Sequence, residues 1–215
     1  MRGTAVSLLL AVAGAPVSGA PAEQSRWFAR VGVLDALYHS GADIAVDGNV
    51  LPGATAHVSD NVTVTFDIGY EVTEHLDVML MLGIPPKPTI TGERAVAGLG
   101  ELGKVRYGPA ILSANYRFRE RGALQPYAGL GVAYAIILKE HDASVLQLDV
   151  HDNWGLALQA GAQYDLGCGR ELFFDFKQLW LAVDARGVLV SGASVAANVR
   201  LDPTLISAGF RFHFN

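Results

Sequence analysis

The chain has 215 residues, of which 51% are hydrophobic and 17% charged, and its formal net charge is −5 at pH 7. Soluble domains average about 25% charged residues, so this composition excludes a disordered chain and disfavours a nucleic-acid partner. It indicates a large apolar surface, held either in a core or in lipid. Beyond the first two dozen residues there is no run of roughly 18 apolar residues, so no transmembrane helix is predicted. A soluble β-rich protein and a transmembrane β-barrel remain.

The first 22 residues are predicted to be a secretory signal peptide, which leaves residues 23–215 as a single domain. Arg2 precedes an apolar stretch that is followed by small residues, as in such peptides. Cleavage after Ala22 is preferred because an A-x-A triplet ends there, and cleavage after Ala20 is the alternative. A short membrane anchor is disfavoured because the apolar stretch is shorter than a bilayer span.

The body of the chain alternates between apolar and polar residues with a period of two, which is typical of barrel strands. From Val62 to Val72 the apolar residues occupy one face, while Thr65 and Asp67 lie on the other. Counting such segments predicts an all-β protein with eight antiparallel transmembrane strands. Their predicted ranges are 26–38, 60–73, 75–84, 104–118, 124–138, 152–166, 171–185 and 199–214.

The predicted connections alternate between short turns and longer loops, as in outer-membrane barrels, which have short periplasmic turns and longer external loops. Short turns are expected at 73–75, 119–123 and 167–170, and longer loops at 39–59, 85–103, 139–151 and 186–198. A soluble eight-stranded barrel would turn its continuous apolar face inward. Here the other face carries Gly, Gln, Asp and Arg, which favours a barrel in the outer membrane of a Gram-negative cell, surrounded by lipid.

Several segments resemble the outer-membrane protein W (OmpW) family. The sequence VRLDP at 199–203, followed by SAGFRF at 207–212, is similar to the closing strand of that family. The segments 125–131, 152–155 and 159–161 look like its fifth and sixth strands. The resemblance covers essentially the whole mature chain. It implies an eight-stranded barrel that gives small hydrophobic molecules passage across the outer membrane, with a lateral exit into the bilayer.

Two features depart from the family pattern. The chain ends in Asn215 rather than in the terminal aromatic residue that family members present to the barrel-assembly machinery, a partner expected during insertion. The third external loop, at 139–151, is short. These departures affect the expected efficiency of insertion and the expected shape of the outer funnel.

Charged residues gather on the inward face near the periplasmic end of the predicted strands. The lumen of an eight-stranded barrel is narrow enough for side chains to fill it, so paired charges are expected to form a plug rather than an ion pore. The expected plug residues are Arg30, Asp67, Glu71, Asp77, Arg117, Asp165, Asp175, Lys177 and Arg211.

Higher in the barrel, the inward face is predicted to become apolar. Such a region fits either packing that seals a small barrel or an apolar gate for cargo. The expected gate residues are Met79, Met81, Ile111, Leu179, Leu181 and Leu205. Of these, Met81 and Leu179 match the apolar constriction that the family resemblance implies, and Trp180 is expected to face outward.

Two prolines fall within predicted strands. Pro109 and Pro203 cannot donate a backbone hydrogen bond, so each weakens a seam of the barrel wall. Each is harmless if it lies outside the bilayer region. The functional interpretation is a gap through which apolar cargo leaves sideways, and Pro109 is favoured because its strand is expected to pair with the strand that carries Met81.

Other motifs carry little weight. Residues 98–103 satisfy G-x-G-x-x-G but lack the flanking strand and helix of a dinucleotide site. The histidines show no ligand spacing, so neither a metal nor another cofactor is expected. A barrel enzyme acting on lipid or peptide is an alternative, with Ser191, Ser194 and His151 as candidate groups that no motif connects. A structural or adhesive barrel is a further alternative. Such a barrel would have aromatic-rich loops, whereas the predicted loops here are rich in Gly, Ala and Val.

Overall fold

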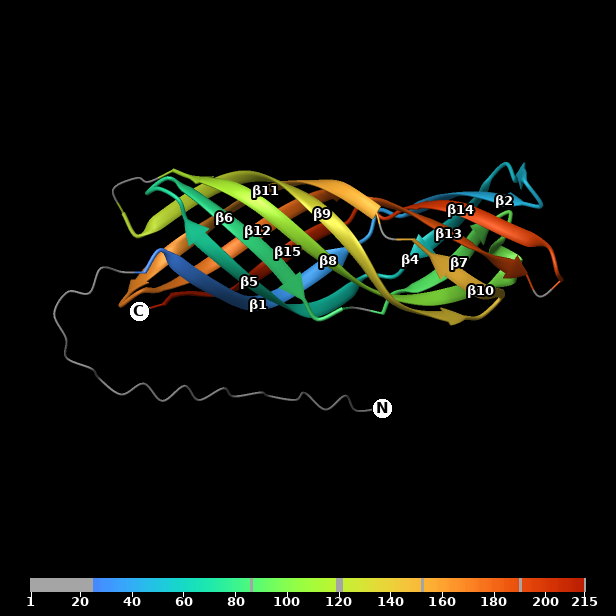
Figure 1. The fold of residues 1–215 in the computed structure, drawn as a ribbon, viewed down its shortest axis with the longest axis horizontal. Coiled ribbons are helices and arrows are strands. Elements are labelled where there is room, and N and C mark those ends of the chain that lie inside the picture. Colours follow the sequence, from blue (N-terminus) through green and yellow to red (C-terminus); the bar gives the residue numbers. More distant parts are fainter. Residues whose placement is uncertain (1–24, 86, 119–121, 152, 190, 215) are drawn as a thin grey trace, which may run out of the picture.

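The computed structural model describes residues 25–85, 87–118, 122–151, 153–189 and 191–214, with the backbone alone at 139–142. The predicted signal peptide and Asn215 lie outside these ranges. The described residues form strands and one short 3-10 helix, η1 (Figure 1). No described helix is long and apolar enough to cross a membrane. The elements are β1 (Trp27–Leu37), β2 (Gly41–Val46), β3 (Asn49–Val50), β4 (Ala54–Val58), β5 (Asn61–Glu71), β6 (Leu76–Gly83), β7 (Thr89–Arg94), η1 (Ala97–Leu99), β8 (Glu101–Arg117), β9 (Leu124–Asp142), β10 (Val145–Val150), β11 (Asn153–Gly167), β12 (Arg170–Trp180), β13 (Ala182–Leu189), β14 (Ser194–Arg200) and β15 (Thr204–His213).

Eight strands close into an antiparallel barrel, which confirms the predicted fold class. Their order around the wall is β8-β6-β5-β1-β15-β12-β11-β9, and β9 pairs back with β8. The terminal strands β1 and β15 pair in register from Phe28 with His213 to Leu37 with Thr204. Closure pairs the two edge strands of the sheet with each other, as the hydrocarbon core of a bilayer requires of a β-structure.

A second sheet continues the molecule beyond the barrel, at the end opposite the C-terminus (Figure 1). Its strand order is β10-β13-β14-β2-β3, while β7 and β4 extend the edge of β8. Most of the predicted external loops are therefore strand rather than loop. The reason is visible in β2 and β4, where Ala42, Ile44, Ala54 and Ala56 are buried at alternate positions, so these short segments also have one face to bury.

Two predicted strands are interrupted where the barrel meets this second sheet. The expected strand at 171–185 is divided at Leu181, which separates β12 from β13. The expected strand at 199–214 is divided at Leu201–Pro203, between β14 and β15. Each interruption lets the chain leave one sheet and enter the other.

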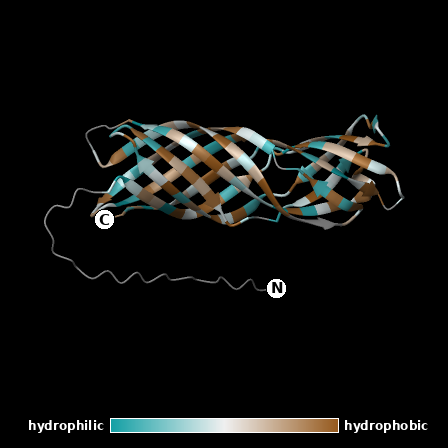
Figure 2. Ribbon diagram, in the orientation of Figure 1, coloured by the Kyte–Doolittle hydropathy of each residue, from teal (hydrophilic) through white to brown (hydrophobic). Residues whose placement is uncertain are grey.

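Hydropathy alternates from residue to residue along the barrel strands (Figure 2), and the residues that face outward are apolar. Phe66, Leu130 and Leu158 point outward and are exposed, whereas Thr65 and Gln159, their neighbours along the strands, are buried. Trp180 is also exposed, as predicted from its place beside Leu179. This alternation places lipid-facing side chains around the wall and polar side chains in the lumen.

The depth of the lipid-facing surface can be tested at two leucines of β11 that are about equally exposed, Leu158 at 48% and Leu166 at 49%. Leu158 lies in the middle of the strand and Leu166 beside its final turn. We expect Leu158→Arg to lower the free energy of unfolding by about 2–4 kcal/mol and Leu166→Arg by about 0–1 kcal/mol, because the cost of a charge on this face depends on its depth in the bilayer. Denaturant unfolding in lipid vesicles measures both, and equal losses would contradict this placement.

Candidate functional site

The centre of the lower lumen is the carboxylate of Asp175, which is completely buried. It accepts hydrogen bonds or ion pairs from Lys177 Nζ at 2.7 Å and from an Arg30 terminal nitrogen at 3.0 Å. Gln159 Nε2 and the Tyr127 hydroxyl also donate to it, at 2.7 Å and 2.5 Å. Arg30 reaches a second carboxylate, Asp67, at 3.2 Å. Two cations and two anions therefore neutralise each other, as burial of charge requires.

Glu71 organises a second group of charges nearer the end of the barrel that holds the short turns. Its Oε1 is paired with Arg117, with Arg211 at 2.5 Å and with His213 Nε2 at 3.2 Å. Arg117 also contacts Asp77 at 3.5 Å. Arg211 completes the group by contacting Glu171 at 3.5 Å and by donating to Gln163.

The guanidinium groups of Arg30 and Arg211 stack on aromatic rings in the lumen. Arg30 lies 3.6 Å from the ring centroid of Phe173, and Arg211 lies 3.7 Å from that of Phe28. Gly69 leaves the space that the Phe28 ring fills, since a Cβ at Gly69 would overlap that ring. These contacts fill the barrel, and the cavity between the side chains has no volume large enough for water.

We call this set the charged cluster: Arg30, Asp67, Glu71, Asp77, Arg117, Glu171, Asp175, Lys177, Arg211 and His213. Of the nine residues predicted for the plug, it contains all but Asp165. Asp165 is exposed, and its carboxylate accepts a hydrogen bond from the backbone N–H of Gly167, the last residue of β11, so that prediction is wrong. Sequence reasoning missed Glu171 and His213, although both lie at inward positions of the two-residue period.

Above the charged cluster the lumen becomes apolar. Met81, Ile111, Leu179, Leu181 and Leu205 are buried in one continuous apolar cluster, and they are called the apolar collar below. Four of them, all but Ile111, line a small cavity of about 20 Å³.

Met79 does not belong to the collar, contrary to the prediction. Its sulfur lies 3.4 Å from a terminal nitrogen of Arg30, and it lines the charged cluster. The reason is its position two residues before Met81 on β6, which sets it one layer lower in the barrel.

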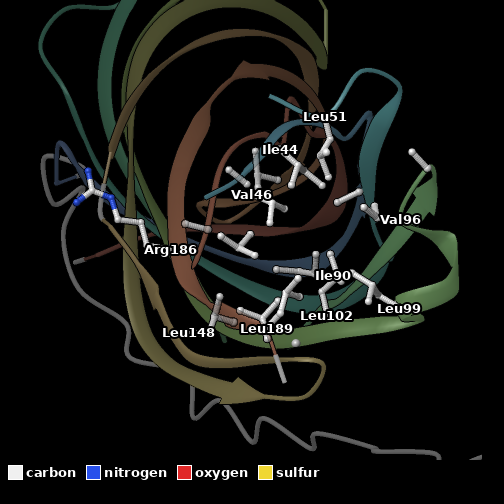
Figure 3. A pocket seen from close by; sticks show the side chains of 18 of the residues that line it. Ile44, Val46, Leu51, Ile90, Val96, Leu99, Leu102, Leu148, Arg186 and Leu189 are labelled. Carbon is white, nitrogen blue, oxygen red and sulfur yellow. The ribbon is translucent and has the colours of Figure 1, made fainter. Parts of the chain in front are cut away.

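A larger apolar cavity of about 390 Å³ lies in the external part of the molecule (Figure 3). Its walls come from β2, β4, β7, η1, β8, β10, β13 and β14. Among the described residues, Arg186 is the one charged residue that lines it, and its guanidinium points away from the other labelled side chains (Figure 3). Sequence reasoning missed this upper cavity because most of its residues fall in the segments predicted as loops, including Gly98, Leu99 and Leu102 of the G-x-G-x-x-G segment.

The barrel wall is incomplete beside Pro109. On one side, β8 pairs with β9 along almost its whole length. On the other side, its pairing with β7 ends at Lys104 and its pairing with β6 begins at Ile111. Residues 105–110 of β8 therefore have no strand partner on that edge among the described residues. Pro109 lines the small cavity of the collar together with Gly83 and Ile84, and Pro85 lies against Gly108.

Pro203 lies in a different setting from the one predicted. It is outside any strand, in the break between β14 and β15, and it also lines the collar cavity. Its carbonyl accepts a hydrogen bond from the Leu179 N–H at 3.0 Å, while Asp202 Oδ1 accepts one from the Leu181 N–H at 2.9 Å. These bonds bridge the seam at Pro203, because loop groups take the place of strand partners.

Two of the three groups considered for an enzyme, Ser194 and His151, have other partners. The Ser194 hydroxyl donates to Asp47 at 3.1 Å, and His151 faces Asp149 at 3.6 Å. No cluster of three or more His, Cys, Asp or Glu side chains with metal-binding geometry occurs among the described residues.

Comparisons with known proteins agree with this architecture. Residues 30–214 match the model of the OmpW family. The dibenzothiophene metabolism operon protein PahQ of Pseudomonas aeruginosa is 36% identical over 186 residues, which cover 86% of this chain and 87% of the relative. Outer membrane protein AlkL of Ectopseudomonas oleovorans is 32% identical over 204 residues, which cover 93% of this chain and 86% of AlkL.

Two solved structures are similar in fold. The crystal structure of the outer membrane protein OprG from Pseudomonas aeruginosa has a TM-score of 0.82 at 21% identity, covering 89% of this chain and 97% of OprG. The solid-state NMR structure of AlkL in DMPC bilayers has a TM-score of 0.69 at 29% identity, covering 94% of this chain and 96% of AlkL. The match to the OmpW family and the similarity to outer membrane protein AlkL confirm the predicted outer-membrane location.

The charged cluster predicts a large effect of one isosteric change. Asp175→Asn would leave Lys177 without a carboxylate partner among the described residues and remove one of two from Arg30. We expect it to lower the free energy of unfolding by about 3–5 kcal/mol, because buried charges lose their compensation. Glu101→Gln, which removes the exposed pair with Lys104 at 3.3 Å, should cost about 1 kcal/mol or less. Denaturant unfolding compares the two, and similar losses would show that water reaches the cluster.

Proposed function

Because this chain belongs to the OmpW family and lies in the outer membrane, we propose that it is a channel for small apolar molecules. In this proposal the cargo occupies the apolar upper lumen, the charged cluster closes the periplasmic end, and the cargo passes sideways between the lumen and the bilayer beside Pro109. The observation that carries the proposal is an apolar column that ends on the charged cluster next to an incomplete stretch of wall.

The apolar column consists of three cavities that share lining residues. The upper cavity of about 390 Å³ shares Ile90, Ala185 and Val199 with a smaller one of about 30 Å³. That cavity shares Tyr107 with the collar cavity of about 20 Å³. An apolar molecule is favoured in such surroundings over water, and a hydrated ion is disfavoured because it would lose its hydration.

The charged cluster argues against a straight path through the barrel. Apolar cargo would have to separate ion pairs such as that of Arg30 with Asp175, leaving buried charges uncompensated. The edge of β8 between residues 105 and 110 offers a less costly route, since no strand hydrogen bonds have to break there. Pro203 is the weaker candidate for this exit because backbone hydrogen bonds bridge its seam.

The relatives fit this class of cargo. PahQ is named for a dibenzothiophene metabolism operon, and dibenzothiophene is an apolar aromatic molecule. The lining of the upper cavity, which is aliphatic apart from Arg186, suits such a molecule without selecting a particular one.

The collar is tested by placing a charge in it. We expect Met81→Asp and Leu179→Asp each to reduce uptake of a hydrophobic fluorescent dye by cells about tenfold or more, because an ionised group in a narrow apolar passage disfavours an apolar occupant. Met81→Leu, which conserves volume and polarity, and Leu146→Asp, on the exposed face of β10, should keep uptake near the original rate. Heat-dependent gel mobility establishes that each variant is folded. Unchanged uptake by both folded Asp variants would remove the collar from the path.

The lateral exit is tested by a pair of matched proline substitutions. Pro109→Ala restores a backbone N–H and removes the ring at the incomplete edge of β8, so we expect slower dye uptake without a loss of stability. Pro203→Ala makes the same change where the seam is already bridged, and it should transport at the original rate. Equal rates in both variants and the original protein would contradict an exit at Pro109.

A further inference from the structure

Two tyrosine hydroxyls meet inside the apolar column. Tyr38 follows the last residue of β1 and Tyr107 lies on β8, and both side chains are buried in the apolar cluster. Their hydroxyl oxygens are hydrogen-bonded to each other, and their ring centroids are 6.4 Å apart in an edge arrangement. The pair therefore crosses the lumen from the end of β1 to β8.

The pair lies where the column is narrowest. Tyr107 lines both the 30 Å³ cavity and the 20 Å³ collar cavity, and Tyr38 lines the latter. These volumes hold about one water molecule each, far less than the upper cavity. Cargo that moves from the upper cavity to the edge beside Pro109 must therefore pass the pair, and the two hydroxyls must separate.

The strand that carries Tyr107 is suited to such a movement. The register of β8 against β9 shifts between Arg106 and Tyr107, and the other edge of β8 has no strand partner here among the described residues. Tyr38 is held more firmly, because its backbone N–H donates to Asp60 Oδ1 at 2.8 Å. Opening of the pair is thus a displacement of Tyr107 relative to Tyr38.

The hydroxyls also give the passage a hydrogen-bonding preference. When two phenol hydroxyls hydrogen-bond to each other, one hydroxyl hydrogen forms that bond and the other still needs an acceptor. Among the described residues neither hydroxyl has a second partner, and the remaining polar side chain that lines the collar cavity, Thr63, already donates to the Ile84 carbonyl at 2.8 Å. Separation of the pair leaves two phenolic donors unpaired in apolar surroundings.

We propose that Tyr38 and Tyr107 form a gate that selects apolar cargo carrying one oxygen acceptor, such as the carbonyl of a ketone or aldehyde, over the corresponding hydrocarbon. The carbonyl accepts a hydrogen bond from a separated hydroxyl and replaces the bond that opening breaks. A hydrocarbon leaves both hydroxyls unpaired. This inference rests on the proposed channel function and specifies the cargo class that the channel passes fastest.

The experiment compares two probes of nearly equal size and shape, 2-acetylnaphthalene and 2-ethylnaphthalene. Their initial uptake is measured in cells that express the original protein, Tyr38→Phe, Tyr107→Phe or the double variant, with cells lacking the protein as background. Tyr116→Phe is the matched control, because it makes the same substitution at a residue on the exposed outer face of the barrel. Heat-dependent gel mobility confirms folding of every variant.

We expect the original protein and Tyr116→Phe to take up the ketone about fivefold faster than the hydrocarbon, the ratio expected for one net hydrogen bond. Each single variant keeps one donor and should keep the preference. The double variant should lose it, with a ratio near one and faster hydrocarbon uptake. A ratio near one in the original protein, or a preference that survives in the folded double variant, overturns the gate while leaving the channel intact. Uptake of neither probe above background overturns the channel itself.

Discussion

The structure depends on the neutralisation of charge in the lower lumen, where the packed side chains leave no space for water. Asp175 and Glu71 each gather several cations, so that the arginine and lysine side chains of the lower lumen are paired with carboxylates or stacked on aromatic rings. This packing requires small residues opposite the large ones, as at Gly69 beneath Phe28. It also fixes where the apolar column ends, since one layer above Met79 the inward residues become aliphatic. The proposed sideways route follows from this obstruction.

A second constraint comes from lipid, which offers backbone groups no hydrogen-bonding partner. The wall satisfies this constraint by closing β9 onto β8 and β1 onto β15. The edge of β8 between residues 105 and 110 departs from it, and Pro109 reduces the cost because it has no N–H to leave unpaired. The same stretch carries Tyr107, so the incomplete wall and the narrowest part of the apolar column share one segment. A movement of that segment would widen the passage and the exit together.

The external part of the molecule gives the column its volume. Sheets that continue the barrel strands carry apolar residues on their inner face and surround the upper cavity. Because these walls are built from β2, β10, β13 and β14 as well as from β8, the cavity exists only when segments far apart in the chain have assembled. An apolar molecule held there is sheltered from water before it reaches the collar, which suits a channel for sparingly soluble cargo.

The sequence by itself determined the barrel, its strand number and which face of each strand meets lipid, because the two-residue period is a local property of a strand with unlike surroundings on its two sides. It also identified most of the charged cluster, whose members lie at inward positions. The tertiary structure decided the rest. Asp165 lies at an inward position of the pattern, but it is near the end of its strand, where its side chain is exposed to solvent and accepts a hydrogen bond from the Gly167 backbone. Met79 lies in the charged layer because its position on β6 is one layer below that of Met81. The upper cavity and the Tyr38–Tyr107 pair depend on strand register and on closure of the sheet, and these bring together residues whose separation along the chain carries no signal of their contact.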